Sequence, residues 1–368
     1  RSTLFPYTTL FRSSYDKMNA LSEIHGNEVC LVTTDQGGHK IPYPLNRSVR
    51  HIDLGIRFVQ QYRYHGLKRY LIYYQLIRLF QRKIKTLIKD ERPDVLITNT
   101  SEFADFLVEC KGEVPLVVES HGTFDRPFHM QEMTITNRIK RYFHNKALSK
   151  VDRIVALTHG DADQWRSINP NVSVIPNIVT MNETDDFSDC ENKRVIFVGR
   201  LDSQKGFQYL SAIWEIVEKR HPDWCLDIYG EGADLQENRN MIPQGKHIFP
   251  HGQTLDILDK YKESSILILT SIYEPFGLVM PEAMSCGIPV VAFDCPYGPS
   301  EIISDGKDGF LIDCYDVEAF ADKLCMLIEN EVIRKQMGMN AIQSALRFKK
   351  GKIMPQWNNL FESLVVKS

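Results

Sequence analysis

The chain has 368 residues, of which 43% are hydrophobic and 25% charged, and its formal net charge is −3. This length exceeds one ordinary core and fits two domains of roughly 150 to 200 residues. The composition excludes a disordered chain. It also excludes a membrane-spanning one, because no apolar run reaches the roughly 18 residues that a spanning helix needs. We identify no secretory signal and therefore expect a cytoplasmic protein.

The charge is unevenly distributed along the chain. Residues 14–180 carry a net charge of +5 and residues 181–368 a net charge of −10. The two halves are therefore expected to meet different partners. The eight cysteines are scattered without metal-ligand spacing, which indicates a reducing compartment and no metal site.

Residues 1–13 differ in character from the rest of the chain. The segment Thr3 to Ser13, TLFPYTTLFRS, resembles the in-frame translation of a sequencing-adapter oligonucleotide, so we interpret residues 1–13 as non-native. Residues 14–26 are typical of the end of a helix that leads into a strand. An α/β domain opens with a strand, a glycine-rich turn and a helix, so we expect the first strand and its turn to be missing.

From residue 28 onward, short β-branched runs alternate with helical patterns, which indicates parallel βαβ units. A first Rossmann-like domain is predicted over residues 14–176, and a polar, acidic linker over 177–192. The strands expected in this half are Glu28–Thr34, Asp94–Asn99, Val114–Glu119, Arg153–Leu157 and Val172–Ile175.

The second half repeats the pattern and predicts another Rossmann-like domain over residues 193–350. Residues 351–368 are predicted to form a helix that packs back toward the first domain, with Trp357 as an apolar anchor. Two doubly wound parallel sheets predict a ligand site at the carboxyl ends of the strands, in a cleft between the domains. The strands expected here are Arg194–Val198, Trp224–Tyr229, His247–Phe249, Ile266–Leu269, Pro289–Phe293 and Phe310–Ile312.

The stretch Lys68–Lys89 carries seven cations and no acid, and its apolar residues recur at helical spacing. Two interpretations remain open: a solvated helix face over a core stripe, or a peripheral contact with anionic lipid head groups. The absence of acids favours the second and suggests the inner face of the plasma membrane.

The strand Arg194–Val198 ends in Gly199 and Arg200, and Lys205 follows at the start of a helix. A strand end, two cations and a helix N-terminus favour a diphosphate, because amides and the macrodipole attract anions while Arg and Lys neutralise them. A structural salt bridge is the alternative interpretation of this pattern.

The segment Ser271 to Asp294 is more specific. Glu274 precedes a tight Pro-Phe-Gly turn and Glu282 follows eight positions later. We expect the amides of Phe276, Gly277 and Leu278 to turn toward a ligand. As eight helical residues span about 12 Å, the two carboxylates are expected to contact different parts of one ligand. This separation argues against a hydrolase pair, whose carboxyls lie about 5 to 9.5 Å apart.

Glu274-x7-Glu282, with Gly199-Arg200 and Lys205 upstream, resembles the retaining GT-B glycosyltransferases of family four, the glycosyl transferase group 1 set. The resemblance runs through nearly all of residues 28–367 and is strongest from 194 to 312. It implies that Glu274 contacts the donor sugar, that Glu282 binds the ribose, and that Arg200 and Lys205 hold the diphosphate.

The resemblance also implies roles for three further positions. His121, after a strand of the first domain, corresponds to a histidine near the donor sugar and the acceptor, although a structural histidine is an equal alternative. Gly230 and Gly252 lie in loops that match those around the nucleotide base. The run Tyr297 to Ile303 is similar to that of members with UDP-hexose or UDP-N-acetylhexosamine donors.

The function implied is a retaining, metal-independent hexosyltransferase without a cofactor. It would move a hexose or N-acetylhexosamine from a nucleotide-diphosphate sugar, a UDP-sugar by the match above, to a lipid-linked or polysaccharide acceptor in surface-polysaccharide biosynthesis. The first domain would bind the acceptor, and no nucleic-acid partner is expected.

Three alternatives remain at this point. An oxidoreductase would need a strand-linked G-x-G-x-x-G, which the sequence lacks. A GT-B sugar-nucleotide epimerase would convert the donor without an acceptor. A sugar-nucleotide-binding remnant would bind the donor without transfer, because the first domain is expected to be truncated.

Overall fold

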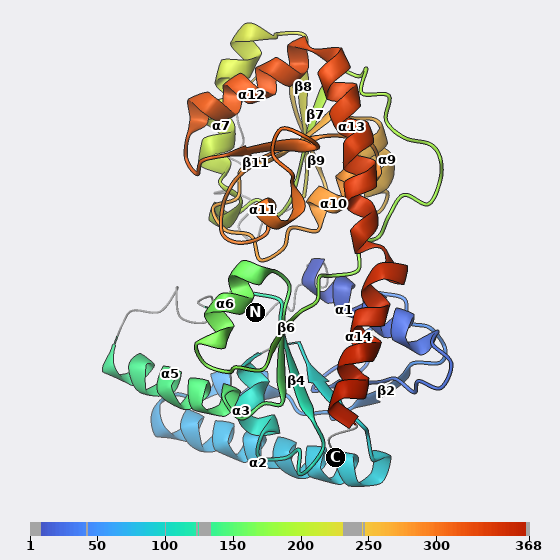
Figure 1. Ribbon diagram of the computed structural model, residues 1–368. Helices are drawn as coiled ribbons and strands as arrows, with labels where there is room; N and C mark the ends of the chain where they lie inside the picture. The colour runs from blue at the N-terminus through green and yellow to red at the C-terminus, as the bar shows by residue number, and fades with distance from the viewer. Residues whose placement is uncertain are drawn as a thin grey trace. The chain divides into compact units, whose positions relative to one another are not determined.

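The chain forms two compact α/β units, which are described separately (Figure 1). In this computed structural model the first unit comprises Arg1–Leu157, Asp161–Ile178 and Lys350–Ser368, and the second comprises Thr158–Gly160 and Val179–Lys349. The structure describes residues 9–41, 43–99, 101–122, 124, 134–230, 245 and 247–365.

The described strands of the first unit form two separate parallel sheets. β1 (Cys30–Thr33) pairs only with β2 (Arg50–Asp53), in a register that opposes Val32 to Ile52. The other sheet has the order β3-β4-β5-β6, in which every neighbouring pair is parallel. Its strands are β3 (Leu96–Thr98), β4 (Leu116–Ser120), β5 (Arg153–Ala156) and β6 (Val172–Val174).

This division corresponds to a doubly wound sheet of order 3-2-1-4-5-6-7 in which no described strand occupies position 1. The neighbouring edges are exposed accordingly, since Val32 on β1 and Ile97 on β3 are both solvent-exposed. β2 was not predicted, because the segment Arg50–Asp53 is polar and mostly exposed and so lacks the apolar run typical of a parallel strand.

The two central strands of the four-stranded sheet, β4 and β5, are almost entirely buried. Along β4, Val117 contributes to one apolar cluster, whereas its neighbours Leu116 and Val118 contribute to another, as the period of two in a strand requires. Short helical segments accompany these layers: η1 (Phe58–Arg63), η2 (Ser101–Phe103), α3 (Ala104–Leu107) and α6 (His159–Arg166). The longer helices of the unit are α1 (Thr9–Ser22), α2 (Gly66–Glu91), α5 (Ile135–Leu148) and α14 (Lys350–Val365).

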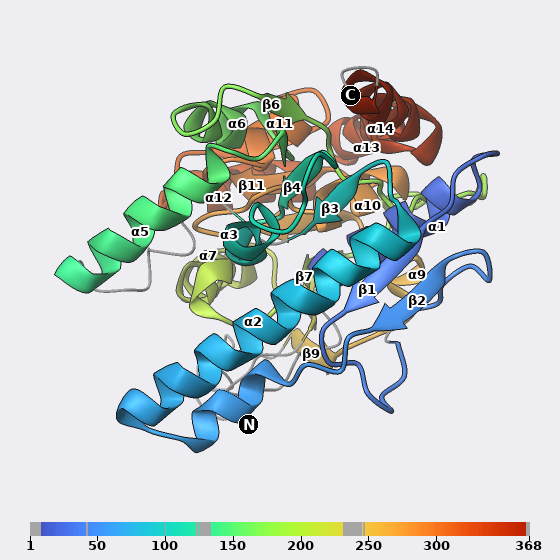
Figure 2. The ribbon, with the colours of Figure 1, turned by 90° about the horizontal axis from the view of Figure 1, so that it is seen from below.

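The last helix, α14, belongs to the first unit although it follows the second in sequence. Its apolar face, which includes Ile353 and Trp357, packs in one cluster with Val117 of β4 and Leu21 of α1. Figure 2 shows α2 and α5 running in similar directions on another side of this unit, with α3 near both.

α1 begins inside the segment that we interpret as non-native. The helix starts at Thr9, so residues 9–13 are helical and continuous with the following residues. Ser13 and Ser14 are both buried. The origin of residues 1–13 stays a prediction, and residues 1–8 lie outside the described part.

The second unit is built on a six-stranded parallel sheet of order β12-β11-β10-β7-β8-β9. Read from β9, this is the doubly wound order 3-2-1-4-5-6, whose switch point lies between β7 and β10. The strands are β7 (Arg194–Val198), β8 (Cys225–Tyr229), β9 (Ile248–Gly252), β10 (Ile266–Leu269), β11 (Val290–Phe293) and β12 (Gly309–Ile312).

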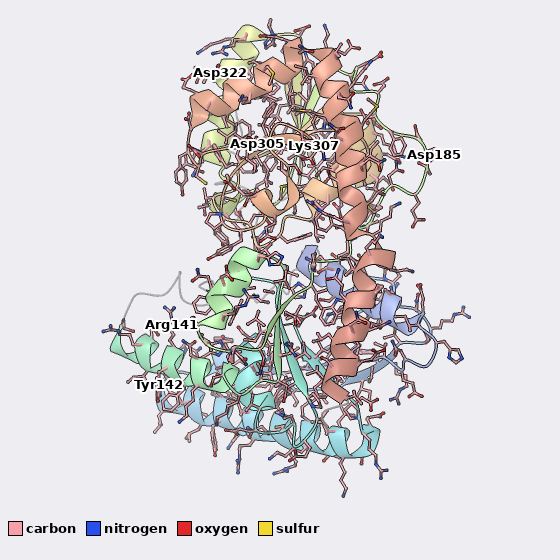
Figure 3. All side chains as sticks on the ribbon, in the orientation of Figure 1. Arg141, Tyr142, Asp185, Asp305, Lys307 and Asp322 are labelled. Carbon is pink, nitrogen blue, oxygen red and sulfur yellow. The ribbon has the colours of Figure 1, made fainter. Side chains whose placement is uncertain are left out.

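Helices cover both faces of this sheet. α7 (Phe207–Arg220) and α12 (Val317–Glu329) pack on one face through Trp214 and Phe320. Arg220 of α7 donates across 2.6 Å to Asp322 of α12, and Asp322 is labelled in Figure 3. α10 packs against α9 and α13. The remaining segments are η3 (Ser203–Lys205), α9 (Ile257–Lys262), α10 (Val279–Ser285), α11 (Pro299–Ile302), α13 (Glu331–Ala345) and η4 (Leu346–Phe348).

The predicted linker, residues 177–192, contains no helix or strand, but it is bound to the second unit from Val179 onward. The amide of Asn182 donates to Ser285 Oγ across 3.1 Å, and the Cys190 thiol donates to the carbonyl of Gly287 across 3.3 Å. The polar composition of the segment gave no signal for these long-range contacts.

We predict that amides of β1 and β2 exchange with solvent faster than those of β7, β10 and β11. A two-stranded sheet with half-exposed strands is marginally stable, whereas β10 and β11 are fully buried in a six-stranded sheet. Hydrogen–deuterium exchange followed by mass spectrometry measures this difference. Equal protection of the two sheets would contradict the prediction.

Candidate functional site

Four predicted site residues gather around the carboxyl ends of β7 and β10, the two strands that flank the switch point of the second sheet. Gly199 and Arg200 follow β7 directly, and Glu274 lies a few residues after β10. In doubly wound sheets ligands bind at this position. The strand order therefore brings together residues that are far apart in sequence.

The turn after β7 places Lys205 in the interior of the second unit. The Asp202 carboxylate accepts from the Lys205 amide across 3.2 Å and so caps η3. Gly206 then has a φ of 66°, and a Cβ there would lie 2.0 Å from the carbonyl oxygen of Thr270. Only glycine fits this close approach of the β7 turn to the end of β10.

The central contact of the site is an ion pair between Lys205 and Glu274. Lys205 Nζ lies 2.7 Å from Glu274 Oε2, and both residues are buried. The Thr270 hydroxyl donates to the Lys205 carbonyl across 2.8 Å, which ties the same two segments through the backbone. Sequence reasoning assigned these residues to different parts of a ligand, and the structure joins them directly.

Arg200 lies at the surface. Its side chain is 45% exposed, and its guanidinium lies 3.0 Å from Asp202 and donates to Gln204 across 3.0 Å. Gln204 in turn donates to the carbonyl of Tyr273 across 3.2 Å, in the turn before Glu274. The site therefore holds one half-exposed cation, Arg200, and one buried cation, Lys205.

The loop that carries Glu274 is fixed by its backbone. The Glu274 amide donates to Pro296 across 2.7 Å, and its carbonyl accepts from Tyr297 and Gly298. Gly277 has a φ of 87°, and a Cβ there would lie 2.9 Å from Glu274 Cγ. Glycine at this position therefore leaves room for the carboxylate.

The surroundings of Glu274 are apolar. Burial raises the pKa of the neighbouring Cys295 thiol far above its ordinary value, and the Glu274 carboxylate raises it further. Phe276 is buried and packs edge-on against Phe348 with ring centroids 5.3 Å apart. Leu278, the third residue of the predicted amide turn, is also buried.

Glu282 is buried in the first turn of α10. One detail of the sequence interpretation was wrong here. Only Val279–Ser285 is helical, so the eight-residue spacing from Glu274 does not convert to about 12 Å by the helical rise. The turn at Gly277 interrupts the helix that this estimate assumed.

Gly230 directly follows β8, the neighbour of β7, and Gly252 is the last residue of β9, the neighbour of β8. The Gly230 amide donates to the Gly252 carbonyl across 2.8 Å, and the Gly199 amide donates to the Tyr229 carbonyl across 3.0 Å. The three predicted glycines thus lie along one edge of the sheet. The rest of the segment that was matched to a base loop, Glu231 and Gly232, lies outside the described residues.

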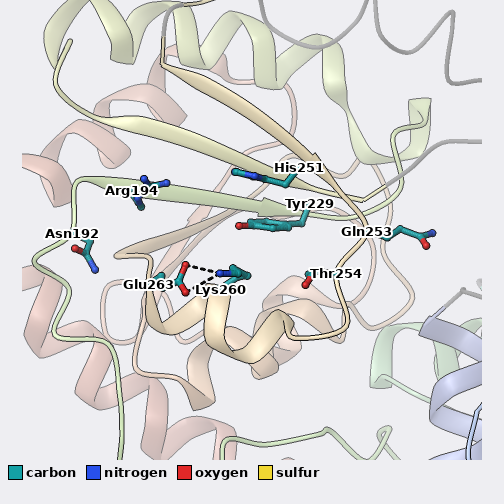
Figure 4. Close-up of a pocket in the computed structure, with 8 residues that line it drawn as sticks. All are labelled: Asn192, Arg194, Tyr229, His251, Gln253, Thr254, Lys260 and Glu263. Atoms are coloured by element: carbon teal, nitrogen blue, oxygen red, sulfur yellow. Dashed lines mark hydrogen bonds and ion pairs between the residues drawn. The ribbon is translucent and has the colours of Figure 1, made fainter.

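A hollow of about 550 Å³ lies beside β8 and β9 (Figure 4). The buried Asp227 carboxylate lies 2.7 Å from Arg194 and 2.6 Å from His251, and the His251 ring stacks on Tyr229. The hollow is lined by Asn192, Arg194, Tyr229, His251, Gln253, Thr254, Lys260 and Glu263. None of the four charged site residues lines it, so we assign the candidate site to the switch point.

His121 lies in the first unit and follows β4 directly. It is buried, and neither ring nitrogen has a hydrogen-bond partner among the described residues; Nε2 lies 3.5 Å from Glu119. Glu119 pairs with Lys17 of α1, and the Lys17 ammonium stands 4.5 Å from the centroid of the Trp357 ring. Burial alone would raise the pKa of Glu119, but Lys17 and His121 lower it to about 2.

Sequence reasoning missed this cluster of buried charges. Glu119 precedes the predicted His121 by two positions, but its partner Lys17 is 102 residues away, and no local pattern connects them. A carboxylate in an apolar strand was the only available signal.

No group of three or more His, Cys, Asp or Glu side chains that could hold a metal occurs among the described residues. The chain has one D-x-D sequence, Asp161-Ala-Asp163, which the sequence interpretation overlooked. Asp161 is buried and accepts from Trp165 and the Phe124 amide, and Asp163 pairs with Arg166. Both carboxylates are therefore engaged in contacts within the protein.

Two family models match successive parts of the chain. The one described as Glycosyltransferase Family 4 matches residues 12–183, and the one described as Glycosyl transferases group 1 matches residues 183–344. Together they match residues 12–344, which include all of the charged residues discussed above.

Curated relatives come from bacterial glycan synthesis. The chain is 33% identical over 221 residues to the amylovoran biosynthesis glycosyltransferase AmsD of Erwinia amylovora, a match that spans 57% of this chain and 62% of the relative. It is 23% identical over 350 residues to an alpha-1,4-N-acetyl-D-galactosaminyltransferase of Campylobacter jejuni named for a PP-undecaprenol-linked glycan, spanning 93% and 91% of the two chains.

Solved structures share the fold. A sucrose-phosphate synthase from Thermosynechococcus elongatus superposes with a TM-score of 0.75 at 19% identity, over 96% of this chain and 92% of that one. S. aureus TarM, solved with fondaparinux, alpha-GlcNAc-glycerol and UDP, gives a TM-score of 0.66 at 24% identity over 78% and 59%. These likenesses identify the GT-B fold, with two Rossmann-like domains.

We predict that Glu119→Gln makes the stability of the chain less dependent on pH in acid. The pKa of Glu119 is about 2 in the folded state against 4.5 for a free side chain. The charged carboxylate therefore stabilises the fold above pH 4.5, and this contribution is lost as the pH falls toward 2. At neutral pH the substitution should cost about 3 kcal/mol, because Lys17 is left buried without its partner.

Urea unfolding monitored between neutral pH and the acid range tests this prediction. Glu113→Gln, at an exposed carboxylate of the same unit, is the matched control and should leave the pH profile unchanged. A Glu119→Gln profile parallel to that of the unsubstituted protein would contradict the assignment.

Proposed function

Since the chain belongs to glycosyltransferase family 4, we propose that it transfers a hexose or N-acetylhexosamine from a UDP-sugar to a lipid-linked or polysaccharide acceptor in surface-glycan biosynthesis. The observation that carries this proposal is the presence of two cations at the switch point of the second sheet, Lys205 paired with Glu274 and Arg200 paired with Asp202. The names of the relatives support the glycan class, and the UDP bound to TarM supports the nucleotide.

Lys205 and Arg200 would hold the donor diphosphate. Lys205 precedes the 14-residue helix α7, whose N-terminus carries about half a positive charge. In the unliganded chain both cations face carboxylates, Glu274 and Asp202. A diphosphate would therefore add a second counter-charge to cations that are already oriented.

The two glutamates would bind the remaining parts of the donor. Glu274, beside Lys205, would contact the sugar hydroxyls next to the diphosphate, and Glu282 would accept from the ribose. The backbone around Gly230 and Gly252 would approach the base. His121 lies in the other unit, and we assign it to the acceptor side of the reaction.

We propose a retaining reaction. The bond between the anomeric carbon and the diphosphate oxygen breaks while the acceptor oxygen attacks from the same face, and the departing diphosphate takes the acceptor proton. The product is a glycoside with the donor's anomeric configuration, together with UDP. Charge that grows on the leaving diphosphate would be stabilised by Lys205 and Arg200, which is why we expect no metal requirement.

Two alternatives use the same site. An epimerase would convert the donor without an acceptor, and a binding remnant would bind UDP without turnover. Incubation with UDP-sugars, with and without a polyprenyl-diphosphate-linked glycan, separates the three, because only a transferase forms a product that depends on the acceptor. A thermal-shift screen of UDP- and GDP-sugars identifies the donor, since a ligand stabilises by RT ln(1 + [L]/Kd).

We predict that Arg200→Ala and Lys205→Ala lower kcat by more than they raise the donor KM, because both cations act on charge that develops as the sugar leaves. Glu282→Gln should mainly raise KM, at a cost of roughly 1 to 3 kcal/mol, because the ribose contact is similar in the ground and transition states. Glu274→Gln should fall between these cases. Steady-state kinetics on one donor measure all four variants.

Lys219→Ala is the control for these kinetics, since Lys219 is an exposed cation of the same unit that pairs with Glu215. Its kinetic constants should not change. The assignment of the diphosphate site would be wrong if Arg200→Ala and Lys205→Ala both kept kcat/KM within twofold, which is about 0.4 kcal/mol of barrier.

We also predict that removing divalent metals leaves transfer within about twofold of its starting rate, because the two cations already compensate the charge of the leaving group. Assays after treatment with EDTA, with and without added Mg²⁺ or Mn²⁺, measure this. A loss of activity that Mg²⁺ or Mn²⁺ restores would overturn metal independence while leaving the transferase assignment intact.

A further inference from the structure

Exposed aromatic and aliphatic side chains gather on η1, α2 and α5 of the first unit. Most apolar side chains of this unit are buried or partly buried, but Leu67, Tyr70 and Tyr142 are 75%, 69% and 64% exposed. Monomeric proteins rarely expose large contiguous apolar surface without a use. We call this surface the docking face and define it by Tyr62, Leu67, Tyr70, Leu71, Tyr74, Ile139, Tyr142 and Phe143.

On α2 the exposed apolar residues form one stripe. Leu67, Tyr70, Leu71 and Tyr74 follow the i, i+3, i+4, i+7 spacing of a single helix face. Further along the helix, Phe80 and Ile84 are buried with Leu54 and Ile56 in a separate cluster. The helix is therefore held against its unit by its second half, and the stripe of the first half has no cover among the described residues.

Cations surround this stripe, and acids are absent from it. No Asp or Glu occurs from Leu54 to Lys89. The cations near the stripe lie over aromatic rings: Arg69 over Tyr62 at 4.5 Å and Arg78 over Tyr74 at 5.9 Å. The basic residues of α2 are Lys68, Arg69, Arg78, Arg82, Lys83, Lys85 and Lys89.

α5 extends the docking face. Tyr142 and Phe143 are exposed, and they stand among the basic residues Arg138, Lys140 and Lys146. Figures 1 and 2 both show the N-terminal ends of α2 and α5 on the same side of the first unit. Figure 3 labels Tyr142 and Arg141 on α5.

Both helices are anchored on the segment that contains α3. His144 of α5 lies 2.9 Å from Asp105, and Gln81 of α2 donates to Glu109 across 2.7 Å. These contacts fix the two helices within one unit. The exposed residues of both helices therefore belong to one unit and are attached to one segment of it.

We propose that the docking face binds the surface of a bilayer that contains anionic phospholipids, with α2 and α5 lying in the interface. Aromatic and aliphatic side chains flanked by Lys and Arg are the composition of an interfacial helix, and each cation adds attraction to anionic head groups. A second copy of the face would be repelled by its own charge. No helix of the described part is long and apolar enough to cross a bilayer, so this contact is peripheral.

The inference goes beyond the proposed chemistry, although a lipid-linked acceptor would lie at such a surface. Its test needs no turnover, so failure of membrane binding and failure of glycosyl transfer are separate results. Co-sedimentation of the purified chain is measured with vesicles of phosphatidylcholine and phosphatidylglycerol, and with vesicles of phosphatidylcholine alone.

Two variants separate the contribution of the apolar stripe to vesicle binding from that of the cations. Leu67→Ser/Tyr70→Ser/Leu71→Ser removes the apolar stripe without changing charge, and Lys68→Gln/Arg69→Gln/Arg78→Gln/Arg82→Gln removes four cations. Each should weaken binding to the anionic vesicles at least tenfold, which is about 1.4 kcal/mol. The control Leu255→Ser/Val332→Ser changes equally exposed apolar residues of the second unit and should bind as the unsubstituted chain does.

Several results would overturn the proposal. Equal binding to neutral and anionic vesicles would mean that the cations do not contribute to binding. Unchanged binding by the Leu67/Tyr70/Leu71 variant would mean that the apolar stripe does not contribute. A stable dimer in sedimentation velocity that this variant dissociates would instead identify the face as a contact between two copies. All variants change exposed residues, and circular dichroism checks that they remain folded.

Discussion

The buried ion pair between Lys205 and Glu274 is the contact on which the candidate site depends. It joins the ends of β7 and β10, which are adjacent only because the sheet has the doubly wound order. A buried pair repays its desolvation poorly, so it contributes little net stability. Its position at the switch point instead gives the chain a fixed cation and a fixed carboxylate where ligands bind in this architecture. The catalytic proposal uses both.

The backbone around this ion pair leaves little space for larger residues at two glycine positions. Gly206 brings the β7 turn against the Thr270 carbonyl, and Gly277 leaves room for the Glu274 side chain. In both places a larger residue would have to displace the segment that holds one partner of the pair. The chemistry of the site is thus specified by side chains, but its geometry is specified by two close approaches of the main chain. Arg200 lies outside this constraint, because its side chain is 45% exposed and its partners Asp202 and Gln204 belong to its own turn.

The second unit was more predictable from the sequence than the first. Its central strands are buried on both faces, so they appear as continuous apolar runs such as Ile266–Leu269 and Val290–Phe293. β2 was not predicted, because its sequence, Arg-His-Ile-Asp, is polar. Arg200, Lys205, Glu274 and Glu282 were predicted as site residues from local motifs. The Lys17–Glu119 pair and the contacts of the 177–192 segment join residues that are distant in sequence. Local sequence patterns predict helices, strands and motifs, but they do not predict which buried charged residues form an ion pair.

The counter-charges distinguish two uses of cations in this chain. At the switch point, Lys205 and Arg200 each face a carboxylate, so the local charge is nearly neutral and the side chains are oriented. On the docking face, Arg69 and Arg78 lie over tyrosine rings, and the surrounding sequence supplies no acid. A cation over an aromatic ring keeps its full charge available to an external anion, and the ring offers apolar area at the same point.

The arrangement at the switch point suits recognition of one ligand in one geometry. The arrangement on the docking face suits a surface on which both charge and apolar area are spread out. We therefore associate Lys205 and Arg200 with a soluble donor, and the cations of the docking face with a lipid surface.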